Sequence, residues 1–193
     1  MGFLDTVLGR SKPVKADLDD LFALPSAALT LEAALGFKPT GLGSVCFKAA
    51  EGAAFAQTQA DVQQLLDAFQ AGDGPKVEVS KDTFGYTWLL VRHDPDDIPG
   101  LVTDLHAVNS GLQDAGFGPQ LLCSLISFAH PDGRRLALVY LYKRGTFYPF
   151  VPLGEAQKRD NALEIEVQGA LANDMKVEPD LTRWFPVWGA PGL

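Results

Sequence analysis

Apolar residues recur at helical spacing in three long segments of the chain. The most regular covers residues 53–70, where Gln and Asp side chains occupy the opposite side and the sequence AGDGP ends the segment. A second helix is predicted from about residue 98 to 115, with Asp97 as its N-cap and Pro99 in its first turn. A third is predicted from about residue 155 to 175. Each of these helices has one apolar face that a core can cover.

Period-two alternation and β-rich composition predict strands in the remaining segments. Five are expected: residues 76–80, 85–93, 121–129, 134–143 and 144–153. The third and fourth form a hairpin around the turn sequence HPDG. In the second, Trp88 lies on one face and Leu89 on the other. We expect Trp88 and Leu138 to be buried with the helical residues Leu65 and Leu105.

The segment before the first strong helix is ambiguous. Residues 16–24 form a short helix that Pro25 interrupts. In residues 27–37 the leucines alternate as in a strand, while the alanine content favours a helix. The turn-like sequence KPTGLG then leads into a predicted strand, SVCFKA. We interpret residues 27–49 as a hairpin.

Consecutive strands joined by short turns imply an antiparallel sheet, and the long helices between them must cover one of its faces. The fold class is therefore α+β. A chain of 193 residues suits one domain, with no need for disulfides or a metal. We divide it into a short amphipathic N-terminal helix (residues 1–13), a single α+β domain (14–178) and an aromatic C-terminal tail (179–193).

The net charge of −8 argues against nucleic acid as a partner, because binding to phosphates requires clustered Lys and Arg. Residues 1–15 carry +2 and the rest of the chain −10. The chain has no visible secretory signal and no run of about 18 apolar residues, so a cytoplasmic protein is expected.

Two segments are candidates for contact with a partner or a membrane. At the N-terminus, a small apolar face is followed by basic residues; the segment packs on its own domain, on a membrane or on a partner. In the tail, aromatic residues either fold back onto the domain or anchor a partner. The candidate contact residues are Phe3, Leu4, Val7, Leu8, Arg10, Lys12, Trp184, Phe185 and Trp188.

No residue pattern predicts catalysis, a metal or a cofactor. His93, His106 and His130 lack the spacing of metal ligands. Cys46 and Cys123 lie in apolar runs and are expected to be buried, reduced thiols. The acidic residues before the second helix are better explained as its start than as a cation site. We therefore expect a protein that is not an enzyme.

A small-molecule sensor is the alternative from another class. It would need an apolar cavity in the sheet–helix sandwich, and four aromatic residues are candidates to line it: Trp88, Tyr140, Tyr142 and Phe150. Simple core packing is the favoured explanation of these aromatic residues.

Four segments of the chain carry a family resemblance: MGFLDTVLGRSKP, LDDLFALPSAALTLEAALGFKPTGLGSVCFK, GTFYPFVPL and RWFPVWG. With them the chain resembles the PspA-associated family PspAB, found mainly in actinobacteria. The resemblance implies a cytoplasmic component of the phage-shock, or envelope-stress, system. Such a protein would bind PspA, a coiled-coil protein that coats membranes, would regulate it, or would act beside it at the membrane. The N-terminal segment adds the expectation of weak peripheral contact at the inner face of the membrane.

The expected architecture also resembles the type III secretion chaperone-like and YbjN-like α+β folds. Those proteins bind other proteins, so the likeness implies a secretion-chaperone-like protein-binding module as a further alternative.

Overall fold

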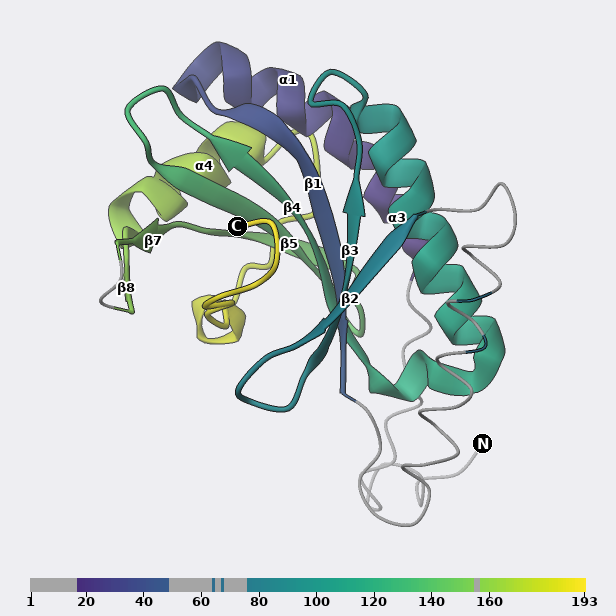
Figure 1. Cartoon of the computed structure of the whole chain (residues 1–193). Helices are drawn as coiled ribbons and strands as arrows, with labels where there is room; N and C mark the ends of the chain where they lie inside the picture. Colours follow the sequence, from purple (N-terminus) through teal and green to yellow (C-terminus); the bar gives the residue numbers. More distant parts are fainter. Residues whose placement is uncertain (1–16, 49–63, 65–66, 68–75, 155–156) are drawn as a thin grey trace, which may run out of the picture.

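The computed structural model describes residues 17–48, 64, 67, 76–154 and 157–193. Its centre is a six-stranded antiparallel sheet with the strand order β2-β3-β1-β4-β5-β6. Three α-helices cover one face, and the C-terminal tail, yellow in Figure 1, crosses the other. The α+β class with helices on one face of an antiparallel sheet is confirmed.

The strands are β1 (Lys38–Phe47), β2 (Val77–Lys81), β3 (Thr87–Arg92), β4 (Leu121–Ala129), β5 (Arg135–Leu141), β6 (Thr146–Phe150), β7 (Pro152–Leu153) and β8 (Lys158–Arg159). The helices are η1 (Leu18–Ala23), α1 (Leu24–Leu35), α3 (Ile98–Leu112), η2 (Gln113–Phe117), η3 (Gly118–Gln120), α4 (Asn161–Leu171) and η4 (Leu181–Arg183). The five predicted strands are therefore confirmed within a few residues, and β7 and β8 form a separate small pair.

Alternation along each strand divides the interior into two layers, because successive side chains point to opposite faces. Leu89 and Leu138 lie in the large core under the helices, whereas Trp88 and Val139 lie on the face crossed by the tail. All four are buried. The predicted orientation of Trp88 and Leu89 is confirmed. Leu65, also expected in the core, lies outside the described side chains.

The predicted hairpin over residues 27–49 is wrong. Residues 24–35 form α1, and its buried positions Leu24, Ala27, Ala28 and Leu31 follow helical spacing. Leu29, which the strand interpretation placed on the same face as Leu31, is 71% exposed. Pro25 does not interrupt the helix, because it occupies the first turn, where no N–H is needed. Gly36 ends α1 in a left-handed conformation.

The sequence KPTGLG is part of β1 and not a turn. The register between β1 and β4 shifts between Pro39 and Gly43, as at a β-bulge. Gly41 has a φ of 74°, and a side chain there would collide with the carbonyl oxygen of His93. The glycine and proline that suggested a turn are thus the residues that permit an irregular strand.

The helix predicted over residues 98–115 is confirmed as α3, and the Asp97 side chain accepts a hydrogen bond from the Gly100 N–H as its N-cap. The helix expected from residue 155 begins later, at Asn161. Asp160 caps it by accepting from the Leu163 N–H, and the residues just before pair as β8. The helix predicted over residues 53–70 falls almost wholly outside the described residues. None of the described helices combines the length and the apolar composition that crossing a bilayer requires.

Candidate functional site

A row of apolar side chains crosses the helix-free face of the sheet and forms the floor of a groove. Trp88 of β3 lies directly opposite Cys46 of β1, Cys46 opposite Cys123 of β4, and Cys123 opposite Leu141 of β5. Directly opposed residues of neighbouring strands point to the same face. The four residues therefore form one continuous apolar strip across the sheet.

The C-terminal tail forms one wall of this groove, and Trp184 anchors it. The Trp184 side chain is 5% exposed, stacks on Tyr148 with 6.1 Å between ring centroids, and donates its indole N–H to the carbonyl of Glu178 at 3.0 Å. The carbonyl of Trp184 accepts from Arg159 at 2.6 Å. The tail is therefore held by a buried ring and by polar contacts on both sides of that ring.

The next residues of the tail are held less deeply. Burial raises the pKa of Tyr148 well above its usual value, so its hydroxyl stays protonated and donates to the Phe185 carbonyl at 2.8 Å. The Phe185 side chain is nevertheless 60% exposed. Trp188 is partly buried and packs edge-on against Phe150 at 4.8 Å. Further along, the Pro191 carbonyl accepts from Ser44 of β1, which ties the end of the tail to the sheet.

The loop between β2 and β3 forms the opposite wall, and Asp82 organises it. One carboxylate oxygen of Asp82 accepts from the backbone N–H groups of Phe84 and Tyr86, each at 2.9 Å. The other accepts from the indole N–H of Trp88 at 2.9 Å. One side chain thus fixes both the loop and the orientation of the floor tryptophan. Phe84 projects from this loop and is 63% exposed.

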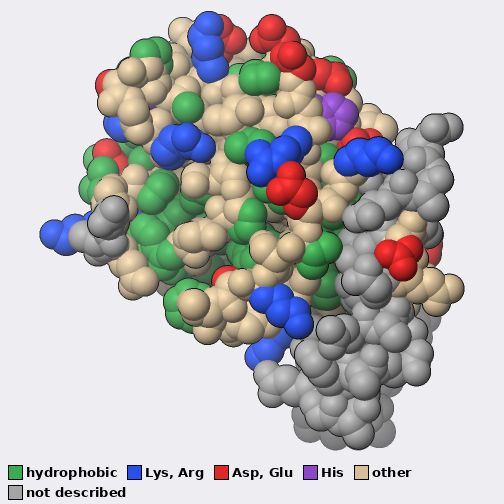
Figure 2. Space-filling view, in the orientation of Figure 1, with side chains coloured by type: hydrophobic (Ala, Val, Ile, Leu, Met, Phe, Trp, Pro, Cys, Tyr) green, Lys and Arg blue, Asp and Glu red, His purple; other side chains and the backbone are tan. Residues whose placement is uncertain are grey.

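Between these walls lies a cavity of about 710 Å³. Besides the floor row, its apolar lining consists of Phe84, Tyr86, Leu122, Tyr148, Phe185, Pro186, Val187 and Trp188. Figure 2, which views this side of the molecule, shows apolar side chains gathered in a hollow of the surface. Half of this apolar lining is aromatic, and it belongs to segments far apart in the sequence. We call this feature the aromatic groove.

Three basic side chains line the aromatic groove together with the carboxylate of Asp82, although the whole chain carries −8. They are Lys143, Arg144 and Arg183. Each arginine uses only Nε for an ion pair, Arg144 with Glu178 at 3.2 Å and Arg183 with Asp180 at 2.9 Å. The remaining guanidinium N–H groups and Lys143 make no further hydrogen bond within the described residues. The rim therefore has donors available for an acidic group.

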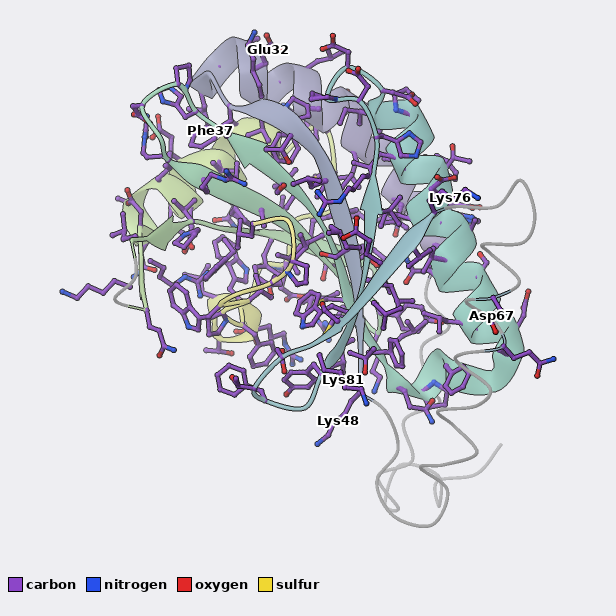
Figure 3. All side chains as sticks on the ribbon, viewed as in Figure 1. Glu32, Phe37, Lys48, Asp67, Lys76 and Lys81 are labelled. Atoms are coloured by element: carbon purple, nitrogen blue, oxygen red, sulfur yellow. The ribbon has the colours of Figure 1, made fainter. Side chains whose placement is uncertain are left out.

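Two more lysines lie at the same end of the sheet. Lys48 directly follows β1, and Lys81 ends β2 just before Asp82. Figure 3 shows both at the end of the sheet from which the loop between β2 and β3 projects. Lys81 pairs with Thr87, the neighbour of Trp88, so by strand alternation its side chain points to the helix-covered face and away from the aromatic groove.

The two thiols of the floor are buried and unbridged, as expected from their apolar surroundings. A hydrogen bond to Cys123, together with burial, raises the pKa of the Cys46 thiol far above its usual range. The Cys46 thiol is therefore protonated at neutral pH.

The histidines contact carboxylates or an aromatic ring and do not meet each other. His93 lies between Asp97 and Asp104, at 2.9 and 2.8 Å, and joins the end of β3 to α3. His106 packs against the ring of Phe22, and His130 contacts Asp132. Within the described parts of the chain, no group of three or more His, Cys, Asp or Glu side chains is placed to hold a metal ion.

The candidate contact residues of the C-terminal tail have different roles in the structure. Trp184 is buried as an anchor, whereas Phe185 and Trp188 line the aromatic groove. The N-terminal candidates Phe3, Leu4, Val7, Leu8, Arg10 and Lys12 lie outside the described residues.

The four aromatic residues considered for a ligand cavity lie on two faces of the sheet. Tyr140 and Tyr142 belong to the core under the helices, and Trp88 and Phe150 to the helix-free face. Sequence reasoning missed Phe84 and Asp82, although an Asp followed by Phe and Gly between two predicted strands is a usable turn signal.

Comparison with known proteins gives one match. The family model PspAB, described as PspA associated protein B, matches residues 1–192. No curated protein and no solved structure matches the chain.

Proposed function

We infer the function from one premise: the chain belongs to the PspAB family, PspA associated protein B. We propose that it is a non-enzymatic adaptor or regulator that binds PspA in a bacterial membrane-stress response. We further propose that it acts in the cytoplasm, at the inner face of the cell membrane. The family name supports the association with PspA, and the adaptor role is our proposal.

The observation that carries this proposal is the aromatic groove. Phe84 and Phe185 project from opposite walls of an apolar hollow and are each more than half exposed. Exposed aromatic residues beside a concave apolar surface are typical of protein-binding sites, because burying them yields much binding energy for little lost side-chain entropy. A groove of this kind accepts the apolar side chains of a partner segment.

The basic rim indicates what flanks that segment. Lys143, Arg144 and Arg183 offer N–H donors beside an apolar floor. We therefore propose that the groove takes a segment of PspA with apolar residues at its centre and acidic residues beside them. The attraction between rim and segment is screened by salt, so affinity should fall as ionic strength rises.

Binding of purified PspA to single-site variants tests the proposal. Phe84→Ala and Phe185→Ala should each weaken binding about tenfold or more, since hot-spot residues contribute about 2 kcal/mol and tenfold corresponds to about 1.4 kcal/mol. Leu29→Ala is the matched control, because Leu29 is an equally exposed apolar residue on α1, in the helical layer. Affinity that is unchanged in both Phe variants, or lowered equally in the control, would contradict the groove as the PspA site.

The N-terminal segment is the proposed place of membrane contact. Its four apolar residues and the net charge of +2 over residues 1–15 support weak, reversible binding to an anionic surface. The full chain should co-sediment with anionic liposomes, whereas a chain that starts at Val14 should stay in the supernatant. Equal sedimentation of the two would refute this role.

A second candidate function is a small-molecule sensor, because the cavity volume of about 710 Å³ matches the usual range for ligand sites, about 300–1,000 Å³. Native mass spectrometry of protein purified from its host decides between the two. A bound molecule that is lost in Trp88→Ala would favour a sensor, and its absence together with PspA binding would favour the adaptor.

A further inference from the structure

The only two cysteines of the chain face each other across neighbouring strands. Cys46 of β1 is directly opposite Cys123 of β4 in the antiparallel register. Both side chains lie on the helix-free face, in the cluster that includes Trp88 and Val139. Packing alone requires apolar side chains here and does not require two thiols in register.

The register places the two residues within bridging distance. Directly opposite residues of an antiparallel pair have Cα atoms about 4.5–5.5 Å apart. A disulfide needs about 4.4–6.8 Å, a range that includes this spacing, and the shift of the β1–β4 register begins only after Cys46, between Cys46 and Phe47. A diagonal neighbour such as Leu125, two positions along β4, lies about 7–8 Å from Cys46 and is too far to bridge.

The aromatic groove is the route by which a reagent reaches these thiols. Cys46 and Cys123 are only 3% and 8% exposed, yet both line the cavity. The faces of β1 and β4 turned the other way are covered by the helices. A small molecule therefore approaches the sulfurs from the groove, and an occupant of the groove would shield them.

We propose that Cys46 and Cys123 form an oxidisable dithiol, a site at which a low-molecular-weight disulfide closes a reversible bridge across the groove floor. A thiolate of the pair attacks the small disulfide, which gives a mixed disulfide and releases one small thiol. The second cysteine of the pair then attacks the mixed disulfide, forms the Cys46–Cys123 bond and releases the second small thiol. The protein loses two electrons and two protons, and the small disulfide is reduced to two thiols.

The surroundings make attack by Cys46 dependent on pH. A hydrogen bond to Cys123 and burial hold the pKa of Cys46 far above neutrality. Since only the thiolate attacks, the rate of attack by Cys46 should rise by up to about tenfold for each unit of pH in the neutral and mildly alkaline range.

Oxidation of the folded full chain by oxidised glutathione tests the proposal. The expected product is a monomer that has lost the mass of two hydrogen atoms, has no alkylatable thiol and regains both thiols with dithiothreitol. Cys46→Ser and Cys123→Ser should each stop at a mixed disulfide or remain reduced. In Cys123→Ser with Leu125→Cys, which moves one thiol to the diagonal position, the bridge should be absent although both thiols are present. Circular dichroism confirms that each variant is folded.

Three results would overturn the proposal: a folded chain that keeps both thiols while the unfolded chain forms the bridge, a folded chain that stops at a mixed disulfide, or a diagonal variant that bridges as fast as the native pair. A second measurement rests on the proposed function. If PspA occupies the aromatic groove, saturating PspA should slow bridge formation several-fold. Unchanged oxidation with PspA bound would place PspA elsewhere, whereas bridge formation without PspA tests the dithiol alone.

Discussion

Trp184 and Phe185 are neighbours in the chain, and the structure assigns them opposite roles. The Trp184 ring is buried against Tyr148, and its indole N–H is used by the Glu178 carbonyl. Phe185 is 60% exposed at the edge of the aromatic groove. Replacing each with alanine should therefore separate stability from partner binding.

The cost of Trp184→Ala follows from its burial. Truncating a buried aromatic residue to alanine costs about 3–5 kcal/mol. In a chain of this size, about 1 kcal/mol lowers the melting temperature by about 2–4 °C, so a fall of about 6–20 °C is expected. Trp184→Phe keeps most of the ring contact but leaves the Glu178 carbonyl without its donor, so a smaller loss of about 1 kcal/mol is expected.

Phe185→Ala is the matched substitution at the next position. Because most of that ring is in solvent, the free energy of unfolding should change by no more than about 0.5 kcal/mol. The melting temperature should therefore stay close to that of the wild type. Differential scanning calorimetry measures the melting temperatures, and titration with PspA measures binding. Our reasoning about the tail is refuted if Trp184→Ala melts with the wild type, or if Phe185→Ala is the more destabilising of the two.

Three further perturbations have definite expected outcomes. Leu105→Ala should cost about 2–5 kcal/mol of unfolding free energy in a denaturant titration, because Leu105 lies on the buried face of α3 and is fully buried. Asp132 accepts hydrogen bonds from the Arg134 backbone N–H and from His130, which lower its pKa from 3.8 to about 2. Its contribution to stability is complete above pH 3.8 and is lost as pH falls through about 2. Asp132→Asn should therefore reduce the dependence of the unfolding free energy on pH in that window. Burial lowers the pKa of His93, but the hydrogen bonds to Asp104 and Asp97 outweigh it and raise the pKa above 6.5. The contribution of His93 is therefore complete below pH 6.5 and lost as pH rises through the raised pKa, and His93→Gln should remove that slope from the stability curve.

Local sequence signals predicted the parts of the fold that depend on neighbouring residues. The hairpin of β4 and β5 follows from two alternating segments around HPDG, and α3 follows from its apolar stripe and the Asp97 cap. The position of Trp88 followed from period-two alternation alone. Each of these signals acts over a few residues, so the sequence contains all the information that is needed to identify it.

The errors occurred where two local signals conflicted. In residues 24–35, leucines at positions two apart suggested a strand, and packing against α4 and α3 selected the helix instead. In KPTGLG, glycine and proline suggested a turn, and pairing with β3 and β4 on both sides keeps the segment extended. Burial of apolar area by a whole element outweighs weak local signals, which is why the leucine alternation in the first segment and the glycine and proline content of the second gave the wrong answers.

The sequence by itself determined the α+β class, five of the six central strands, the phase of β3, and the family to which the chain belongs. Only the tertiary structure decided that the aromatic groove exists. Its floor comes from strands β3, β1, β4 and β5, and its walls come from a loop and a tail that are nearly a hundred residues apart in the chain. The tertiary structure likewise decided that Trp184 is an anchor while Phe185 is exposed, and that Cys46 lies opposite Cys123. Each of these is a contact between residues distant in the chain, and no local preference of the backbone encodes which distant residue a side chain will meet.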